Sequence, residues 1–363
     1  MDRHDMPEDV TAERVAQMHQ EDLKVEQLFG CKGMTYWCDE KRKIAFCLIE
    51  APDEKAIEAM HLHAHGDVPH KIIEVDTTIV ESFLGRIGDP ENVRNTRLNI
   101  IDDPAFRILM AAKIERTHLK NSDTDELEKT VKLANQSLEN NITKFNGRPV
   151  KQKDNYVLVS FDSVTNAVLC ALENQSIPAN TSHSSNLNIK MGLSAGVPVT
   201  DKVNIFEDAS KMSKYLCEIT QGRVMVTSEV KDLFEGENFN RTIDKSIAVL
   251  DLNTEIFLRS LMEYFEKEWN NPALTVEKLS VGLGVSKSQA NRKLRSLTSK
   301  SPNQFIQEIR LQKSLTAIKL NHKTISEIAY DSGFTSPTYF SRAFKKRFGM
   351  SPKEFAIDHI QPY

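Results

Sequence analysis

The sequence lacks any run of 18 uncharged apolar residues, so no membrane-spanning helix is expected. Its first ten residues, MDRHDMPEDV, are polar and acidic, unlike a secretory signal. The five cysteines are odd in number and scattered, which argues against a disulfide framework. Hydrophobic residues make up 40% and charged residues 27%, which excludes a disordered or collagen-like chain. We therefore expect a folded protein of the reducing cytoplasm that does not act at a membrane.

Charge is unevenly distributed along the 363 residues, although the net charge is only −4. From Thr254 onward there are 17 Lys and Arg against 10 Asp and Glu, whereas the preceding residues hold 30 against 41. A basic end on an acidic body is expected where only that end meets a polyanion. Polar breaks near 88–95, 101–105 and 244–253 divide the chain. We predict three domains, at residues 1–95, 100–240 and 250–363.

The C-terminal segment has a helical pattern and contains one internal repeat. Capping residues precede each predicted helix, and Gly284 and Gly333 supply two matching turns. This pattern predicts two helix-turn-helix units that flank one long helix. In such units the second helix enters the major groove of DNA. The side chains that we expect to contact DNA are Lys287, Ser288, Gln289, Asn291 and Arg292 in the first such helix, and Thr338, Ser341, Arg342 and Lys345 in the second. The alternative is that these basic faces are simply solvated surface.

Residues of about 255–355 resemble an AraC-family DNA-binding domain. The resemblance lies in LTVEKLSVGLGVSKSQANRKLRSLTSKSPNQFIQEIRLQKSLTAI and in ISEIAYDSGFTSPTYFSRAFKKRFGMSPKEF. It implies DNA contacts by exposed side chains of both recognition helices, and it implies that Ala290, Leu294, Phe340 and Phe344 are core. By position, the implied contacts are Ser288, Asn291 and Arg292 in the first helix and Thr338, Ser341 and Arg342 in the second.

The N-terminal segment shows the order strand, helix, strand, strand, helix, strand, which predicts a ferredoxin-like α+β sandwich. The last strand is expected within HKIIEVDTTIVESFLG, residues 70–85. Six of the ten histidines lie in the first 70 residues. His61 and His65 are four residues apart on a predicted helix, so their rings share a face and can meet one metal ion.

Further ligands for such a metal must come from elsewhere, and His4 and His19 are the candidates. His63 points away from the face of His61 and His65. Imidazole ligands suit nickel, zinc or copper, and affinity order alone does not choose among them. Alternatively, the histidines form a surface cluster that interacts with the helix dipole.

Residues of about 1–76 resemble a small family of ferredoxin-like proteins described as nickel-binding. The matching segments are MDRHD, TAERVAQMHQEDL, TYWCDE, AFCLIEAP and the HAHG region. The resemblance implies nickel or another divalent transition metal as a cofactor or effector.

The middle segment predicts a second α+β sandwich, and residues of about 106–230 resemble a class III nucleotidyl cyclase domain. The matching segments are NGRPVKQ, NYVLVSFDSVTNAVLCAL, LNIKMGLSAG and QGRVMVTSEV. Active cyclases hold two metal ions with two aspartates, and those positions correspond here to Ala112 and Asn155, with Asp154 one residue away. We therefore expect no catalysis, and a role in ligand binding or in pairing subunits into a homodimer.

These features together predict a transcription regulator of the AraC family with a multidomain α+β and all-α fold. Its partner is double-stranded promoter DNA, and its effector is a metal or an unidentified small molecule. One alternative is a nucleotide-binding protein or nucleotidyl cyclase with a DNA-binding tail, which the missing aspartates disfavour. Another is that the N-terminal domain is only a structural interaction module.

Overall fold

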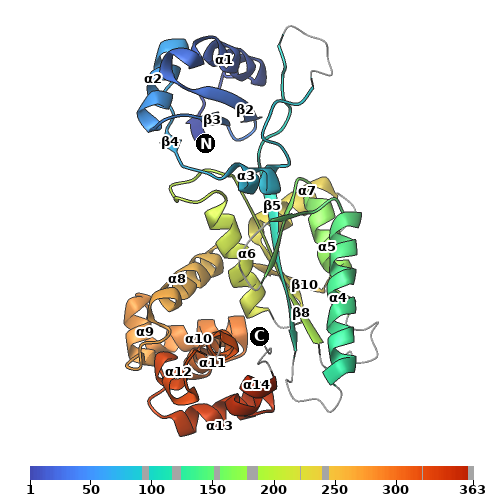
Figure 1. The fold of residues 1–363 in the computed structure, drawn as a ribbon, viewed down its shortest axis with the longest axis vertical. Coiled ribbons are helices and arrows are strands. Elements are labelled where there is room, and N and C mark those ends of the chain that lie inside the picture. Colours follow the sequence, from blue (N-terminus) through green and yellow to red (C-terminus); the bar gives the residue numbers. More distant parts are fainter. Residues whose placement is uncertain are drawn as a thin grey trace.

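The computed structural model describes residues 1–91, 98–116, 124–150, 156–177, 187–220, 222–238, 245–320 and 322–358. Figure 1 shows a small α+β unit at the top, a larger sheet with helices beneath it, and a bundle of helices at the lower left. This is the multidomain α+β and all-α architecture expected from the sequence. No described helix is long and apolar enough to cross a membrane.

The N-terminal unit is an antiparallel sheet of order β2-β3-β1-β4 with two helices on one face, which is the predicted ferredoxin-like arrangement. Thr11 and Asp53 cap its two helices through their side chains. The elements are β1 (Asp2–Asp5), α1 (Ala12–Val25), the 3₁₀ helix η1 (Glu26–Phe29), β2 (Lys32–Asp39), β3 (Ile44–Glu50), α2 (Glu54–Ala64) and β4 (Lys71–Ile72).

The expected strand at 70–85 is wrong beyond its first residues. Only Lys71–Ile72 form β4, and Thr77–Leu84 form helix α3. The Asp76 side chain accepts hydrogen bonds from the backbone N–H groups of Thr78 and Ile79, and Gly85 ends the helix in a left-handed conformation. The capping aspartate and terminal glycine outweigh the β-branched composition of the segment.

The middle unit is a six-stranded sheet of order β10-β9-β8-β5-β7-β6. Two expectations need correction here: the sequence predicts RVMVTSEV, residues 223–230, as the last strand, but residues 228–230 begin helix α7, and an additional strand, β10, pairs in parallel with β9. Ala112 is fully buried in β5, and Asp154 and Asn155 lie outside the described residues. The elements are β5 (Arg107–Arg116), α4 (Thr124–Lys144), β6 (Arg148–Val150), β7 (Val157–Phe161), α5 (Val164–Gln175), β8 (Leu187–Gly196), α6 (Glu207–Ile219), β9 (Val224–Thr227), α7 (Ser228–Glu237) and β10 (Ile247–Leu250).

The C-terminal unit consists of helices only and has the predicted repeat. Ser286 with Gln289, and Thr324 with Glu327, form capping boxes at equivalent places in the two halves. Gly284 and Gly333 both have positive φ at the expected turns. The helices are α8 (Leu252–Glu268), α9 (Val276–Gly282), α10 (Lys287–Thr298), α11 (Pro302–Leu320), α12 (Ile325–Asp331), α13 (Pro337–Phe348) and α14 (Pro352–Asp358).

Helix α6 crosses the sheet of the middle unit very closely at Gly192 in β8. A methyl group on Gly192 would overlap the carbonyl oxygen of Ser213 and approach the backbone nitrogen of Cys217 to 2.5 Å. Because these are backbone atoms, a rotamer change cannot relieve the overlap.

We therefore expect Gly192→Ala to lower the free energy of unfolding by about 3 kcal/mol, measured by urea denaturation. Gly236→Ala is the control, because nothing lies within 4 Å of its new methyl group. It should leave stability unchanged or slightly raised. Equal effects of the two substitutions would contradict the close approach of α6.

Candidate metal centre and nucleic-acid interface

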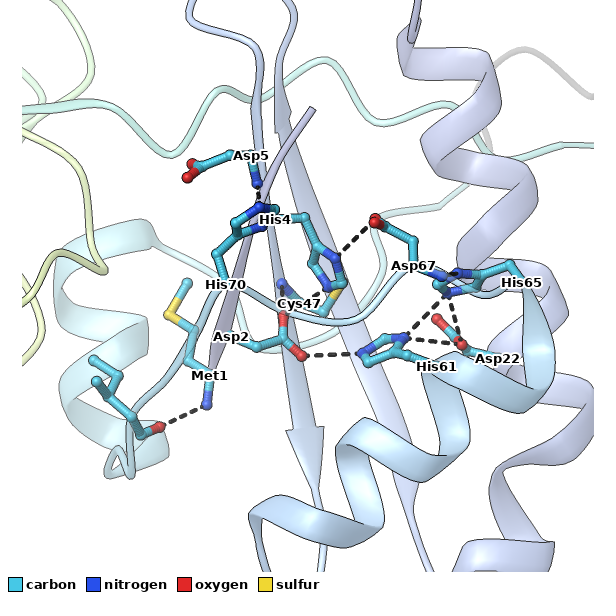
Figure 2. A network of polar contacts seen from close by, with 11 residues as sticks. Met1, Asp2, His4, Asp5, Asp22, Cys47, His61, His65, Asp67 and His70 are labelled. Carbon is cyan, nitrogen blue, oxygen red and sulfur yellow. Dashed lines mark hydrogen bonds and ion pairs between the residues drawn. The ribbon is translucent and has the colours of Figure 1, made fainter. Parts of the chain in front are cut away.

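A pocket of about 240 Å³ lies between β1 and the two helices of the N-terminal unit. Strand β1 supplies His4, helix α1 supplies Asp22, and helix α2 supplies His61 and His65 (Figure 2). The two α2 histidines lie one helical turn apart and face the pocket together, as their spacing predicted.

One group of donors in this pocket consists of Asp22, His61 and His65. Nδ1 of His61 lies 3.1 Å from Oδ1 of Asp22 and 3.1 Å from Nε2 of His65. Nε2 of His65 lies 3.2 Å from the same carboxylate oxygen. One ligand atom from each of the three residues lies within 4.8 Å of the other two, so a single cation can contact all three.

A second group, Asp2, His4 and Cys47, adjoins the first through His61. Oδ2 of Asp2 lies 3.1 Å from Nε2 of His61, and its Oδ1 accepts a hydrogen bond of 3.0 Å from the backbone N–H of Cys47. Nδ1 of His4 lies 3.0 Å from Oδ2 of Asp67. Nε2 of His4 is buried and makes no hydrogen bond to the described residues, but it lies 3.6 Å from Oδ1 of Asp2. Once it gives up its proton, a buried ring nitrogen of this kind can contact a metal ion.

Ionic contacts set the protonation of this network. Burial by itself would lower the pKa of His61, but its contacts with Asp2 and Asp22 outweigh burial and raise it to about 9. Burial would lower the pKa of His4 and raise that of Asp2, but their ionic contacts outweigh burial, so the pKa of His4 is raised and that of Asp2 is lowered. Burial raises the pKa of the Cys47 thiol to about 12. Without a metal ion, then, protons on the imidazoles compensate the buried carboxylates.

Three of the four predicted ligands, His4, His61 and His65, come together in this pocket. His19 also lines the pocket but belongs to neither donor group: its Nε2 lies 3.3 Å from Asp89, and its ring packs on Tyr36 at 5.0 Å. The sequence interpretation missed the donors Asp2 and Asp22 and the His4 partner Asp67, and it considered Cys47 as a soft donor but assigned it to the core. Asp22 follows Val15 and His19 on the buried stripe of α1, and a carboxylate on such a stripe is a usable signal.

The predicted DNA-contacting side chains lie on the surface of α10 and α13. All are exposed except Ser341, which is half-buried, whereas Ala290, Leu294, Phe340 and Phe344 are fully buried as expected. Lys287 is paired with Glu277 at 2.6 Å. The Gln289 side-chain oxygen accepts a hydrogen bond from the Ser286 backbone, so this side chain caps its own helix.

Known families match both ends of the chain. Residues 279–356 match a family described as helix-turn-helix domain. The C-terminal domain is a helix-turn-helix domain of the AraC type. Residues 1–75 match a family described as nickel responsive protein SCO4226-like, so the N-terminal unit is an SCO4226-like domain.

Individual relatives match the AraC-type domain. Histidine kinase P4 of Formosa agariphila is 37% identical over 28% of this chain and 7% of its own length. The HTH-type transcriptional regulator MtrA of Neisseria gonorrhoeae is 31% identical over 27% of this chain and 31% of its own. The matched region therefore spans less than a third of either relative. A solved adenylate/guanylate cyclase/hydrolase from Silicibacter pomeroyi is 22% identical to this chain. The match covers 36% of this chain and 81% of the solved chain, with a TM-score of 0.32.

The metal-free protein should lose stability as the pH rises from about 6.5 to about 9. Folding raises the pKa of His61, so its ion pairs stabilise the folded state fully at pH values below the ordinary histidine pKa of 6.5. This stabilisation is lost as the pH rises through about 9. Urea unfolding in EDTA across this range measures the effect. His61→Gln should show a flatter profile, and parallel profiles for the two proteins would contradict the buried ion pairs.

Proposed function

We propose that this chain is a cytoplasmic transcription regulator that binds promoter DNA through its AraC-type domain and responds to a divalent transition metal, nickel first, in its SCO4226-like domain. The observation that carries the proposal is the coexistence of two capped, exposed recognition helices with a buried cluster of imidazole and carboxylate donors.

The donor set of the N-terminal pocket fits a divalent transition metal. Three imidazoles and two carboxylates supply nitrogen and oxygen ligands, and Cys47 adds a soft donor once its thiol loses its proton. The buried Nε2 of His4 and the shared position between Asp22, His61 and His65 are the natural contact points. A bound cation would replace the imidazole protons that compensate Asp2 and Asp22.

Nickel binding tests this site directly. Removal of a ligand in His65→Ala should weaken nickel binding at least about tenfold in isothermal titration calorimetry. His63→Ala is a matched control on the same helix, because His63 is exposed and its ring lies against Phe29 outside the pocket. Equal affinities for the two variants would contradict the assignment of the pocket.

The two recognition helices favour a bipartite DNA site. Helix α11 connects the two helix-turn-helix units, so α10 and α13 are held on one rigid support. Two reading helices on such a support suit major-groove segments roughly one DNA turn apart, that is about 34 Å. Binding sites enriched by the full chain from random duplexes should therefore contain two conserved blocks at that spacing.

On such a selected duplex, Arg342→Ala should cost about 1–3 kcal/mol of specific binding if its guanidinium reads a guanine edge. Lys345→Ala should instead weaken binding to all duplexes alike and reduce its salt dependence. Lys24→Ala, which removes an exposed charge from the N-terminal domain, is the control. A fluorescence titration in which Arg342→Ala binds as well as Lys24→Ala would contradict the base contact.

We further propose that the middle domain is not catalytic and pairs two subunits. Residues 107–114 of β5 hold no carboxylate, so this strand lacks the first metal-binding aspartate of active cyclases. Formation of cyclic nucleotide from ATP or GTP with Mn²⁺ would show that the domain is catalytic. A monomeric mass in analytical ultracentrifugation would show that it does not pair subunits.

A further inference from the structure

Helix α6 has residues in two apolar cores, one shared with the N-terminal unit and one shared with the C-terminal unit. Its residues Ala209 and Cys217 belong to an apolar core that also contains Trp37 and Phe46 of the N-terminal sheet. Its residues Met212 and Leu216 belong to a second core with Leu258 and Leu261 of α8. Figure 1 shows α6 between the sheet of the middle unit and α8. A displacement of α6 therefore alters the packing of the first helix of the DNA-binding unit.

Strand β1 connects the metal pocket to the same apolar core. Its alternate residues Asp2 and His4 lie among the donors of the pocket, and Met1 belongs to the core shared with the middle unit. Arg3, between the two pocket residues, donates a hydrogen bond of 3.4 Å from its NH1 to the carbonyl oxygen of Val199. A shift of β1 on metal binding would reach residue 199 through this hydrogen bond.

The segment from Val197 to Phe206 leads from this contact into α6. Phe206 has φ of +52°, an uncommon conformation for a bulky residue. Its fully buried ring stacks on Phe83 of α3 at 4.8 Å, and its N–H donates to the carbonyl oxygen of Pro198 at 2.8 Å. Packing thus holds a strained backbone at the start of α6, as occurs at switch positions.

Asp208, in the first turn of α6, joins this segment to the DNA-binding unit. Its Oδ2 accepts a hydrogen bond of 2.9 Å from Thr200, and its Oδ1 accepts one of 2.9 Å from NH1 of Arg259 in α8. Tyr215, two turns along α6, donates to Glu266 of α8 at 2.8 Å. Within the described residues, contacts therefore run without a break from the metal pocket to α8.

We propose that segment 197–206 and α6 couple occupancy of the N-terminal metal site to the position of α8, with Asp208 as the junction. The proposal rests on the proposed function for its ligand, and it adds the route by which the ligand acts. It requires that nickel change the local stability of α8 through Asp208 and Arg259.

Amide hydrogen exchange on the full chain, with and without NiCl₂, tests the route without DNA. Nickel should change the hydrogen-exchange rates of backbone amides in α8 by about fivefold or more in the wild type. Asp208→Ala and Arg259→Ala should bind nickel with unchanged affinity and lose this response, and Asp208→Glu should restore it. Lys231→Ala removes one partner of the comparably exposed Lys231–Glu235 pair in α7 and should keep the response.

Nickel bound without any change at α8 in the wild type would overturn the proposal, as would an undiminished response in Asp208→Ala. A prior nickel titration of the same samples separates these results from failure of the metal site itself. On a selected duplex, nickel should change wild-type DNA affinity at least about fivefold, and DNA should change nickel affinity by the same factor. A chain that shows the α8 response but binds no duplex would disprove the DNA-binding function and leave the route intact.

Discussion

The carboxylate of Asp2 is fully buried, and the N-terminal domain can keep it ionised only by surrounding it with partners. His4 and His61 lie on either side, and the backbone N–H of Cys47 supplies a further hydrogen bond. Removing one partner from a buried ion pair is strongly destabilising because it leaves an uncompensated charge. The domain therefore requires positive charge in this pocket, either as protons on the imidazoles or as a metal ion.

This requirement explains why a ligand in the pocket can have consequences elsewhere. Protonated imidazoles and a metal ion make different geometric demands, because a cation draws its donors toward one point. Strand β1 carries Asp2 and His4, and its Arg3 donates a hydrogen bond to the carbonyl of Val199. Met1, which precedes the strand, belongs to the core shared with the middle domain. Close packing transmits such a shift, because well-packed cores deform little. The domains are thus parts of one contiguous structure.

The sequence predicted best those features that are local. Capping boxes, turn glycines and helical spacing lie within a few residues of one another, so both helix-turn-helix units and their buried residues were predicted correctly. The pairing of His61 with His65 is equally local. Asp22 meets these histidines only because α1 packs beside α2, and Asp2 reaches His61 only through the sheet register, so the sequence does not show either pairing, although the buried stripe of α1 marks Asp22 itself. At segment 77–84 the local signal, the Asp76 cap, is present in the sequence and prevails in the structure over the β-branched composition that suggested a strand.

The division of charge between the two parts of the chain now has a structural meaning. The basic C-terminal helices keep their recognition faces exposed, while several of their cations already have acidic partners, such as Arg347 with Glu308 and Lys287 with Glu277. The second pair is exposed and therefore weak, so a phosphate can take the place of Glu277 at little cost. Arg347 is half-buried against α11 and fixes the orientation of α13 instead. In the proposed function, specific binding depends on how α8 and α11 hold the two recognition helices, and that geometry is what a metal effector would change.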